Sequence, residues 1–307
     1  MSRVTQHRGA AWRKACCASL VAATWCLVSQ SSFIASSHAL PRHSAASTGM
    51  VGSSMPSKRQ LTVHRQGWGD PVDFFDASVY ENVEAADGFR SIILEAPSTV
   101  LDPYTKPGQF VQAKAVDEEK PSFYAISSPP SSGDKAEFLI KVAPSNDWLV
   151  NAKKGDSVLL SAAMGKGFPV DGESWDGAVN QVGIFATGSG IAPIRSMIES
   201  GALRGKATRL YYGARSESAM PFQERFSEWT KKDGIEVVPV LSQAGSDWAG
   251  RTGYVQDAFQ QDEEQGEGFV LSSQHGGILC GQKEMAEDVR KLYESLDVPP
   301  ERVLTNF

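Results

Sequence analysis

Apolar positions in the first part of the chain's body come in six short runs that are rich in β-branched and aromatic residues. Turn-forming Pro, Gly and Asp residues separate the runs. Short strands with turn signals between them are typical of all-β domains, so this pattern predicts an antiparallel β-barrel. The predicted strands cover residues 78–83, 89–94, 109–115, 123–126, 137–142 and 157–160.

After a soft boundary at residues 170–178, buried-looking strands alternate with helical stretches. This alternation predicts an α/β domain with a parallel, Rossmann-like sheet wound by right-handed crossovers. Ligands of such sheets bind at the carboxyl ends of the strands. The predicted strands cover residues 181–187, 208–214, 236–242, 277–281 and 303–307, and the predicted helices lie near residues 193–203, 221–232, 253–260 and 283–296.

The last predicted helix shows its period most clearly, because Met285, Val289, Leu292 and Leu296 recur at spacings of four, three and four. A chain of 307 residues has the length of about two domains. Its 41% hydrophobic and 21% charged residues are those of a globular protein. We therefore expect a leader over residues 1–69, a β-barrel over 70–172 and an α/β domain over 173–307.

The distribution of charged residues also divides the chain between residues 69 and 70. Residues 1–69 hold eight basic residues and no acidic one, whereas residues 70–307 hold 22 basic and 36 acidic residues, a formal charge of −14. Non-specific binding to nucleic acid needs clustered Lys and Arg, so the acidic body argues against a nucleic-acid partner.

The leader has the composition of a targeting segment. An apolar run at residues 15–28 follows four basic residues, and at 14 residues it is too short for a comfortable membrane span. Residues 29–69 are rich in Ser, Ala and Arg, with Phe33 shortly after the apolar run. This layout resembles the bipartite leader of algae with plastids inside extra membranes. The open alternatives are a mitochondrial leader, a secretory signal or retained anchor, and a disordered tail.

Metal ligands are scarce in the body, where Cys280 and His275 are the only Cys and His after residue 69. One Cys and one His cannot build a zinc site, an iron–sulfur cluster or a disulfide framework. Redox chemistry must therefore use a bound organic cofactor. His275 falls in a loop that looks flexible, and a nucleophilic Cys–His pair is the weaker alternative for these two residues.

The sharpest motif is the strand Val182-Gly-Ile-Phe-Ala-Thr187, which continues into Gly188-Ser-Gly-Ile-Ala-Pro193 and a predicted helix. Glycines at the end of a strand let backbone NH groups approach a diphosphate, and Pro193 suits the first helical turn. A Walker-type loop is excluded, since no Gly-Lys-Ser/Thr follows. A plain glycine-rich turn is the structural alternative.

Four further features carry weight through their order along the chain. They are Pro107-Gly-Gln-Phe-Val111, Pro121-Ser-Phe-Tyr-Ala-Ile-Ser-Ser-Pro-Pro130, Ile278-Leu-Cys-Gly-Gln-Lys-Glu-Met285 and the terminal Phe307. Taken singly, they would be a strand edge, a turn, a buried core cysteine and a frayed end.

Together these motifs resemble the ferredoxin–NADP reductase superfamily of flavin-dependent reductases, over residues 76–307. Within it, Tyr212-Gly-Ala-Arg215, Pro239-Val-Leu-Ser-Gln243 and Gly253-Tyr-Val-Gln256 look most like the plant plastid "fruit protein" type of FAD/NAD(P)-binding oxidoreductase.

The resemblance implies that the barrel binds FAD, with Tyr124 against the isoalloxazine and Ser128 near the phosphate. Ser122 stands where the family has an Arg that clamps the diphosphate, for which Lys120 or Lys166 could substitute, and Ala125 stands where a Ser faces flavin N5. FMN is the alternative flavin. A simple turn is the alternative for the segment around Gly165. The implied flavin-binding residues are Tyr124, Ala125, Ile126, Ser127, Ser128, Gly165, Lys166 and Gly167.

The resemblance also implies that the α/β domain binds NAD(P)H. Cys280 would position the nicotinamide, and Phe307 would cover the flavin until nicotinamide displaces it. The implied nucleotide-binding residues are Thr187, Gly188, Gly190, Ile191, Ala192, Pro193, Arg215, Ser242, Tyr254, Gly281 and Met285.

The preferred coenzyme is only partly readable. Ser242 and Tyr254 match positions that hold a 2′-phosphate, and Arg215 or Arg251 could add charge, which favours NADPH. Gln243 replaces an expected Arg, so NADH stays open.

The implied activity passes hydride between nicotinamide and flavin N5, and then electrons to an unidentified acceptor such as ferredoxin, a quinone or a small molecule. The alternative activity is that of a flavin-binding electron-transfer or regulatory subunit that needs a partner for turnover. A nucleotide-binding interaction protein without flavin is a third possibility.

Overall fold

The structure is a computed structural model that describes residues 72–116, 120–266 and 274–305. The described residues belong to one compact unit that contains two six-stranded sheets. The predicted leader lies outside the described residues. The predicted boundary between residues 172 and 173 falls between the two sheets, and it stays a prediction as a domain boundary.

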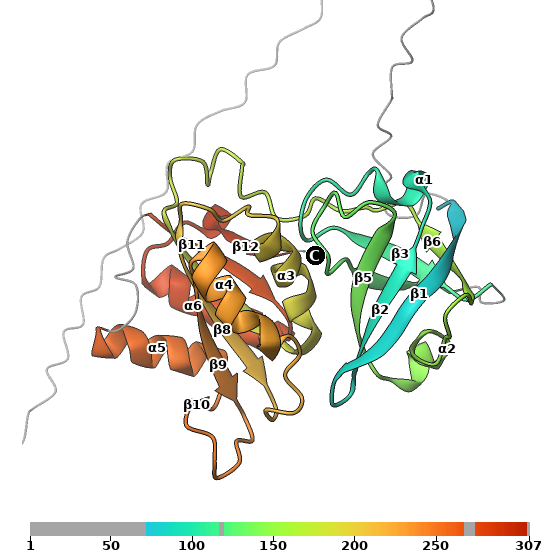
Figure 1. The fold of residues 1–307 in the computed structure, drawn as a ribbon. Coiled ribbons are helices and arrows are strands. Elements are labelled where there is room, and N and C mark those ends of the chain that lie inside the picture. The colour runs from blue at the N-terminus through green and yellow to red at the C-terminus, as the bar shows by residue number, and fades with distance from the viewer. Residues whose placement is uncertain (1–71, 117–119, 267–273, 306–307) are drawn as a thin grey trace, which may run out of the picture. The chain divides into compact units, whose positions relative to one another are not determined.

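The first sheet is antiparallel throughout, with the strand order β4-β3-β6-β1-β2-β5 (Figure 1). After β4, the backbone NH of Ser127 donates to the carbonyl oxygen of Glu137 on β5 at 2.7 Å, which brings the two edges together into a barrel. The predicted barrel is confirmed. Its elements are β1 (Phe74–Ala86), β2 (Phe89–Glu95), β3 (Phe110–Lys114), β4 (Ser122–Ala125), β5 (Lys135–Lys141), β6 (Ser157–Ser161) and the short helices α1 (Ser98–Leu101) and α2 (Asp147–Val150).

Strand β1 is longer than residues 78–83, the range predicted for it. Its first part pairs with β6 and its second part with β2, with a register shift after Val79. The exposed acidic residues at positions 76 and 84, one on each side of the predicted range, hid this length, because they interrupt the apolar pattern that reveals a strand. Neither α1 nor α2 was predicted, since four residues are too few to show a helical period.

The second sheet is parallel throughout, with the strand order β10-β9-β8-β7-β11-β12. This confirms the predicted α/β architecture. Its elements are β7 (Gln181–Thr187), α3 (Ile191–Glu199), β8 (Ala207–Ala214), α4 (Phe226–Asp233), β9 (Ile235–Leu241), β10 (Arg251–Thr252), α5 (Val255–Gln265), β11 (His275–Cys280), α6 (Lys283–Ser295) and β12 (Val303–Thr305).

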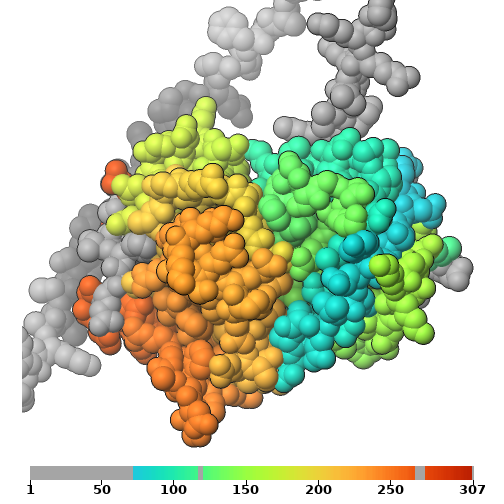
Figure 2. Space-filling view, in the orientation of Figure 1, coloured from blue at the N-terminus to red at the C-terminus, as the bar shows by residue number. Residues whose placement is uncertain are grey.

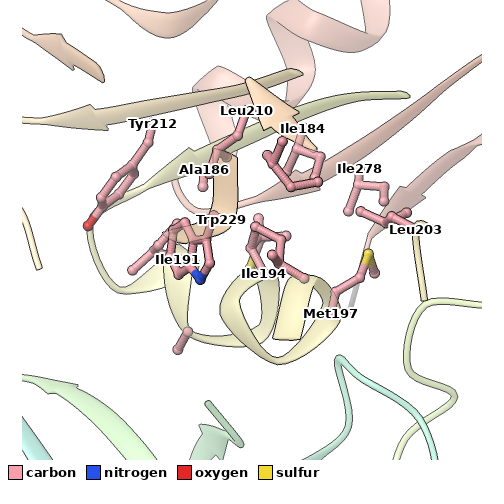
Figure 3. Packing of buried hydrophobic residues seen from close by; sticks show 14 of the residues in the cluster. Ile184, Ala186, Ile191, Ile194, Met197, Leu203, Leu210, Tyr212, Trp229 and Ile278 are labelled. Carbon is pink, nitrogen blue, oxygen red and sulfur yellow. The ribbon is translucent and has the colours of Figure 1, made fainter. Parts of the chain in front are cut away.

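Helices cover both faces of this sheet, because successive strand residues point to opposite sides. Ile184, Leu210 and Ile278 pack under α3 and α4, together with Met197 and Trp229 (Figure 3). The neighbouring residues in the same strands, such as Phe185 and Leu279, pack instead under α5 and α6. Both faces are therefore buried, which explains the nearly continuous apolar runs of these strands.

Three details differ from expectation. Tyr293, fully buried, completes the inner face of α6, whereas Leu296 is 39% exposed and lies beyond the helix end. His275 is not in a flexible loop but is the fully buried first residue of β11, where its Nε2 lies 3.0 Å from the Tyr293 hydroxyl oxygen. Helix α3 starts at Ile191, two residues earlier than predicted.

No helix within the described ranges is long and apolar enough to cross a membrane.

The order of the strands places a topological switch point between β7 and β11. From β7 the chain runs through α3 to β8 on one side, while β11 pairs with the other side of β7. Binding crevices of open α/β sheets lie at such points, outside the carboxyl ends of the strands. The loop from β9 to β10, residues 242–250, projects from the same sheet (Figure 2) and is mostly exposed.

Candidate functional site

The chain after β7 forms a tight turn, Gly188–Gly190, that we call the glycine loop; it leads directly into α3. Gly188 has a φ of +53°, which favours glycine. Gly190 lies so close to the backbone carbonyl of Cys280 that a Cβ there would clash. The first NH groups of a helix have no intrahelical partners, so the loop and α3 present backbone donors suited to a diphosphate.

The turn after β11, residues 280–282, packs against this loop. The backbone NH of Gln282 donates to Thr187 Oγ1 at 2.9 Å, and Gly281, with a φ of +146°, leaves no room for a Cβ beside Thr187. The predicted residues Thr187, Gly188 and Gly190 therefore meet Cys280 and Gly281 at the switch point, although about 90 residues separate them in sequence.

The Cys280 side chain is a buried thiol in this arrangement. It is 7% exposed, and burial raises its pKa to about 12. A thiol with such a pKa is protonated at neutral pH and is a poor nucleophile. This fits a positioning contact and argues against a nucleophilic Cys–His pair.

Arg215, Ser242 and Tyr254 come from three separate segments that meet at the same edge of the sheet. Backbone hydrogen bonds join them: Ser242 N to Ala214 O at 3.0 Å, residue 243 N to Arg215 O at 2.8 Å, and residue 253 N to residue 241 O at 2.9 Å. All three side chains are exposed. Arg215 makes no ion pair among the described residues.

Arg251, the other arginine considered for the 2′-phosphate, has a different partner. Its Nη2 forms a close ion pair with Asp262, which is 3% exposed and also binds Arg209 and Tyr211. The Arg251 charge is therefore compensated within the protein.

Residues 124–128, which we call the barrel segment, begin in β4 and continue past the hydrogen bond from Ser127 to β5. Tyr124 is half-buried, and burial raises the pKa of its hydroxyl, partly offset by hydrogen bonding to Ser122 and Asn146. Ile126 and Ser127 are fully buried. The Ser127 Oγ has no hydrogen-bond partner among the described residues.

Gly165, Lys166 and Gly167 lie beside the start of β3. Gly165 and Gly167 have positive φ, and the Gln109 amide joins the two segments by donating to the Gly165 carbonyl oxygen at 3.2 Å. Gln109 also accepts from the backbone NH groups of residues 105 and 106. Gln109 falls within one of the sequence motifs, but that motif assigned it no role. The sequence signal for its structural role was an amide side chain directly after a Pro-Gly turn.

The remaining predicted residues lie in helices or outside the described residues. Ile191, Ala192 and Pro193 are buried in the first turn of α3, and Met285 is buried in the core under α6. Phe307 lies outside the described residues. A surface groove of about 630 Å³ lies elsewhere on the barrel, is lined by residues such as Tyr80 and Lys154, and includes none of the predicted site residues.

Sequence reasoning missed the side chains that connect the barrel to α3. Glu137 on β5 forms an ion pair with Arg195 on α3, and Tyr104 hydrogen-bonds Ser196. A charged residue inside an otherwise apolar helix, as Arg195 is within Ile191–Glu199, was the only sequence signal. The partner cannot be read from sequence, because it lies on a distant strand of the other sheet.

No group of three or more His, Cys, Asp and Glu side chains within the described ranges could hold a metal ion.

Comparison with known proteins places this geometry in a family. A family model described as the oxidoreductase NAD-binding domain matches residues 184–291, the stretch with the glycine loop and Cys280. Fruit protein pKIWI502 from Actinidia deliciosa is 33% identical over 235 residues, which cover 72% of this chain and 72% of that protein. An NAD(P)H-flavin reductase from Vibrio harveyi is 24% identical over 198 residues, 61% of this chain and 79% of that protein.

The fold likeness extends to solved structures. A ferredoxin NADP+ reductase from Neisseria gonorrhoeae, with bound FAD and NADP, is similar with a TM-score of 0.63 at 17% identity, over 76% of this chain and 97% of that chain. The identity to the fruit protein, over most of both chains, is high enough to establish kinship. The chain belongs to the family of this fruit protein, and it shares the fold of the ferredoxin NADP+ reductase.

Proposed function

We propose that the chain is an FAD-dependent NAD(P)H oxidoreductase that passes electrons from pyridine nucleotide to a further acceptor. The observation that carries the proposal is the meeting of the glycine loop with Cys280 and Gly281 at the switch point, in one compact unit with the barrel segment. The relatives described as NAD(P)H-flavin reductase and ferredoxin NADP+ reductase support it.

The barrel offers groups that fit a flavin dinucleotide. The half-buried Tyr124 ring provides an aromatic surface, and the buried Ser127 Oγ lacks a hydrogen-bond partner among the described residues. Lys166 is exposed between two glycines and makes no ion pair within the described ranges, so its ammonium can meet a phosphate. Ser122, which stands at the position of the family's Arg, hydrogen-bonds Tyr124 and carries no charge. A cation such as Lys166 would therefore bind the diphosphate in place of that Arg.

When bound, FAD would supply N5 as the acceptor of a hydride from nicotinamide C4, with NAD(P)H oxidised to NAD(P)+ and two electrons passed to the acceptor. The protein's part is orientation. The glycine loop would hold the diphosphate with its backbone NH groups, and the buried Cys280 thiol would lie beside the nicotinamide without exchanging a proton at neutral pH.

The test is an anaerobic absorbance titration of the purified full chain with NADPH and, separately, NADH. Prompt bleaching of a yellow protein is the expected result. A yellow protein that neither nucleotide bleaches would favour the partner-dependent subunit, which Ala125 and Ser122 motivate. A protein that stays colourless after incubation with FAD and with FMN would contradict the flavin assignment.

We infer that NADPH is the preferred coenzyme. The exposed Arg215 beside Ser242 and Tyr254 offers an uncompensated cation for a 2′-phosphate. Arg215→Gln is expected to weaken NADPH binding about 10-fold and to leave NADH unchanged. Arg204→Gln, an equally exposed arginine outside this cluster, is the matched control. Equal weakening of both nucleotides in R215Q would contradict the assignment.

The acceptor stays open among ferredoxin, a quinone and a small molecule. The −14 charge of residues 70–307 favours a small acceptor or a basic partner over an acidic carrier protein. Turnover assays with each acceptor class at low and high salt separate them, because only docking of a charged protein depends steeply on ionic strength.

We infer a plastid location from the leader. Its acid-free composition and the apolar run at residues 15–28 support this, as does the plant origin of the fruit protein. Residues 1–69 fused to a fluorescent protein are expected to direct it to plastids of an alga with complex plastids. Mitochondrial or secreted fluorescence would contradict the inference.

A further inference from the structure

Four polar side chains connect the barrel to α3, and the function proposed above does not use them. Glu137 Oε1 on β5 lies 2.6 Å from Arg195 Nη1 on α3, an ion pair without a well-aligned hydrogen bond. The Tyr104 hydroxyl, after α1, shares a 2.5 Å hydrogen bond with Ser196 on α3. The Arg195 and Glu137 side chains are 5% and 15% exposed, so both contacts are largely shielded from water.

On the barrel side, Glu137 and Tyr104 hold the barrel segment. The Ser127 NH donates to the Glu137 carbonyl oxygen at 2.7 Å, and the Glu137 NH donates to Ser128 Oγ at 3.0 Å. The Tyr104 hydroxyl donates to the Ser128 carbonyl oxygen at 2.7 Å, so Ser196 is the donor in the other contact. A shift of either residue therefore shifts the segment that carries Tyr124.

On the α3 side, the same contacts act close to the glycine loop. Arg195 follows Gly190 by five residues, about 7.5 Å along a helix. Its orientation is fixed from two further directions, by Glu199 Oε1 at 3.1 Å from Nε and by the Phe222 ring at 4.8 Å from the guanidinium carbon. The guanidinium cannot swing toward another partner without breaking these contacts.

Electrostatics keeps both partners charged. Burial by itself would raise the pKa of Glu137, but the Arg195 guanidinium outweighs it and, with the Ser91 hydroxyl and the Arg225 charge, holds that pKa below its usual value. Burial would lower the pKa of Arg195, but Glu137 and Glu199 raise it. Each ion therefore depends on the other for compensation.

A buried ion pair adds little net stability, because loss of hydration offsets most of the attraction. An ion pair is directional, whereas apolar contacts are not. Apolar side chains alone would let the barrel and α3 shift relative to each other, but the Glu137–Arg195 pair and the Tyr104–Ser196 hydrogen bond allow one alignment. We propose that Glu137 and Arg195 are positioning residues that set the alignment of the glycine loop with the barrel segment, and hence of nicotinamide with flavin. This inference depends on the proposed function.

Two variants of the full chain form the test. Glu137→Gln removes the carboxylate charge that acts across the two sheets, while the control Glu236→Gln removes a carboxylate that pairs with Arg209 within the α/β sheet. Tyr104→Phe, which removes the second bridge with little change in volume, is the variant to use if E137Q does not fold.

The first measurement is flavin reduction at saturating NADPH, together with the Kd for NADP+. E137Q is expected to lower the reduction rate constant about 10- to 100-fold with the Kd within about 2-fold, because misplacement of about 1 Å impairs transfer more than binding. E236Q is expected to keep the rate constant within about 2-fold. An unchanged rate in E137Q, or an equal fall in both variants, would overturn the proposal.

The second measurement needs no cofactor. Hydrogen–deuterium exchange of the cofactor-free chain is expected to rise at least about 5-fold in residues 124–128 and in α3 of E137Q, and in neither segment of E236Q. A rise confined to α3 in E137Q, or an equal rise in both variants, would overturn the proposal. If neither nucleotide reduces the wild-type protein, the proposed function fails, while this exchange result still tests the alignment.

Discussion

Burial decides the charge state of two side chains on β11. Cys280 and His275 both have little or no solvent contact, and burial always disfavours the charged form. The pKa of Cys280 is therefore raised to about 12, and that of His275 is lowered to about 4. Both residues are neutral at pH 7, which excludes a thiolate–imidazolium pair.

Alkylation of Cys280 by iodoacetamide at pH 8 is expected to be about 1,000-fold slower in the folded chain than in urea. The reason is the thiolate fraction, which falls by about that factor when the pKa rises from about 8.5 to about 12. Peptide-resolved mass spectrometry follows this residue separately from the other three cysteines. Equal rates in both states would show that the thiol is accessible and activated.

His275 makes folding sensitive to mild acid. The unfolded chain takes up a proton near pH 6.5 and the folded chain only near pH 4, so the unfolded state binds more protons between these values. Stability is expected to fall by about 3 kcal/mol as the pH drops from 6.5 to 4. His275→Gln, measured by urea unfolding at several pH values, should remove that part of the slope. An unchanged dependence of stability on pH would show that carboxylates, and not His275, cause it.

At the scale of elements, the site depends on two turns that must fit together. Gly188 supplies a positive φ, and Gly190 supplies the absence of a side chain against the Cys280 carbonyl. The two glycines of one loop therefore meet different requirements, a conformation in one case and a close approach in the other.

Gly190→Ala and Gly188→Ala test this distinction. G188A is expected to cost about 1–2 kcal/mol, the strain of a left-handed conformation, because its Cβ would meet only an ordinary van der Waals contact with Phe89 at 3.8 Å. G190A is expected to cost more and to weaken NADP+ binding at least about 10-fold, because its Cβ would displace the β11 turn. Thermal unfolding and NADP+ titration check both. Similar losses in the two variants would show that the turns are not closely packed.

Elements were predicted correctly where the hydrophobic pattern is long, and they were missed where an element forms only by pairing with another segment. Strand β7 was predicted with its observed bounds, because seven residues between turn signals carry a continuous apolar run. Strand β10 has two residues and forms only by pairing with β9. Helix α5 continues to Gln265, beyond the predicted end, because its last turns are polar and mostly exposed and so show no period.

At the scale of the whole molecule, the barrel and the α/β sheet are joined by charge as well as by apolar packing. Phe89 and Leu139 from the barrel strands belong to the same buried cluster as Ile184 and Trp229. Apolar contact provides most of the attraction, whereas Glu137 and Arg195 define its direction.

A double-mutant cycle measures how strongly this ion pair couples the two sheets. Glu137→Gln and Arg195→Gln are expected to couple by about 1–3 kcal/mol in urea unfolding of the cofactor-free chain. Glu137→Gln combined with Arg209→Gln, whose ion pairs involve Glu236 and Asp262, should be additive within about 0.5 kcal/mol. A coupling below about 0.5 kcal/mol in the first cycle would show that the ion pair has no energetic role.

The sequence alone determined the two architectures, the glycine loop and the family, because periodicity and short motifs are local properties of neighbouring residues. It could also identify Cys280 and Arg215 as candidates by their place in those motifs. Only the tertiary structure decided that Arg251 is compensated by Asp262, that His275 is buried against Tyr293, and that Glu137 meets Arg195. Burial and ion pairing depend on which distant segments come together, and no local pattern encodes that.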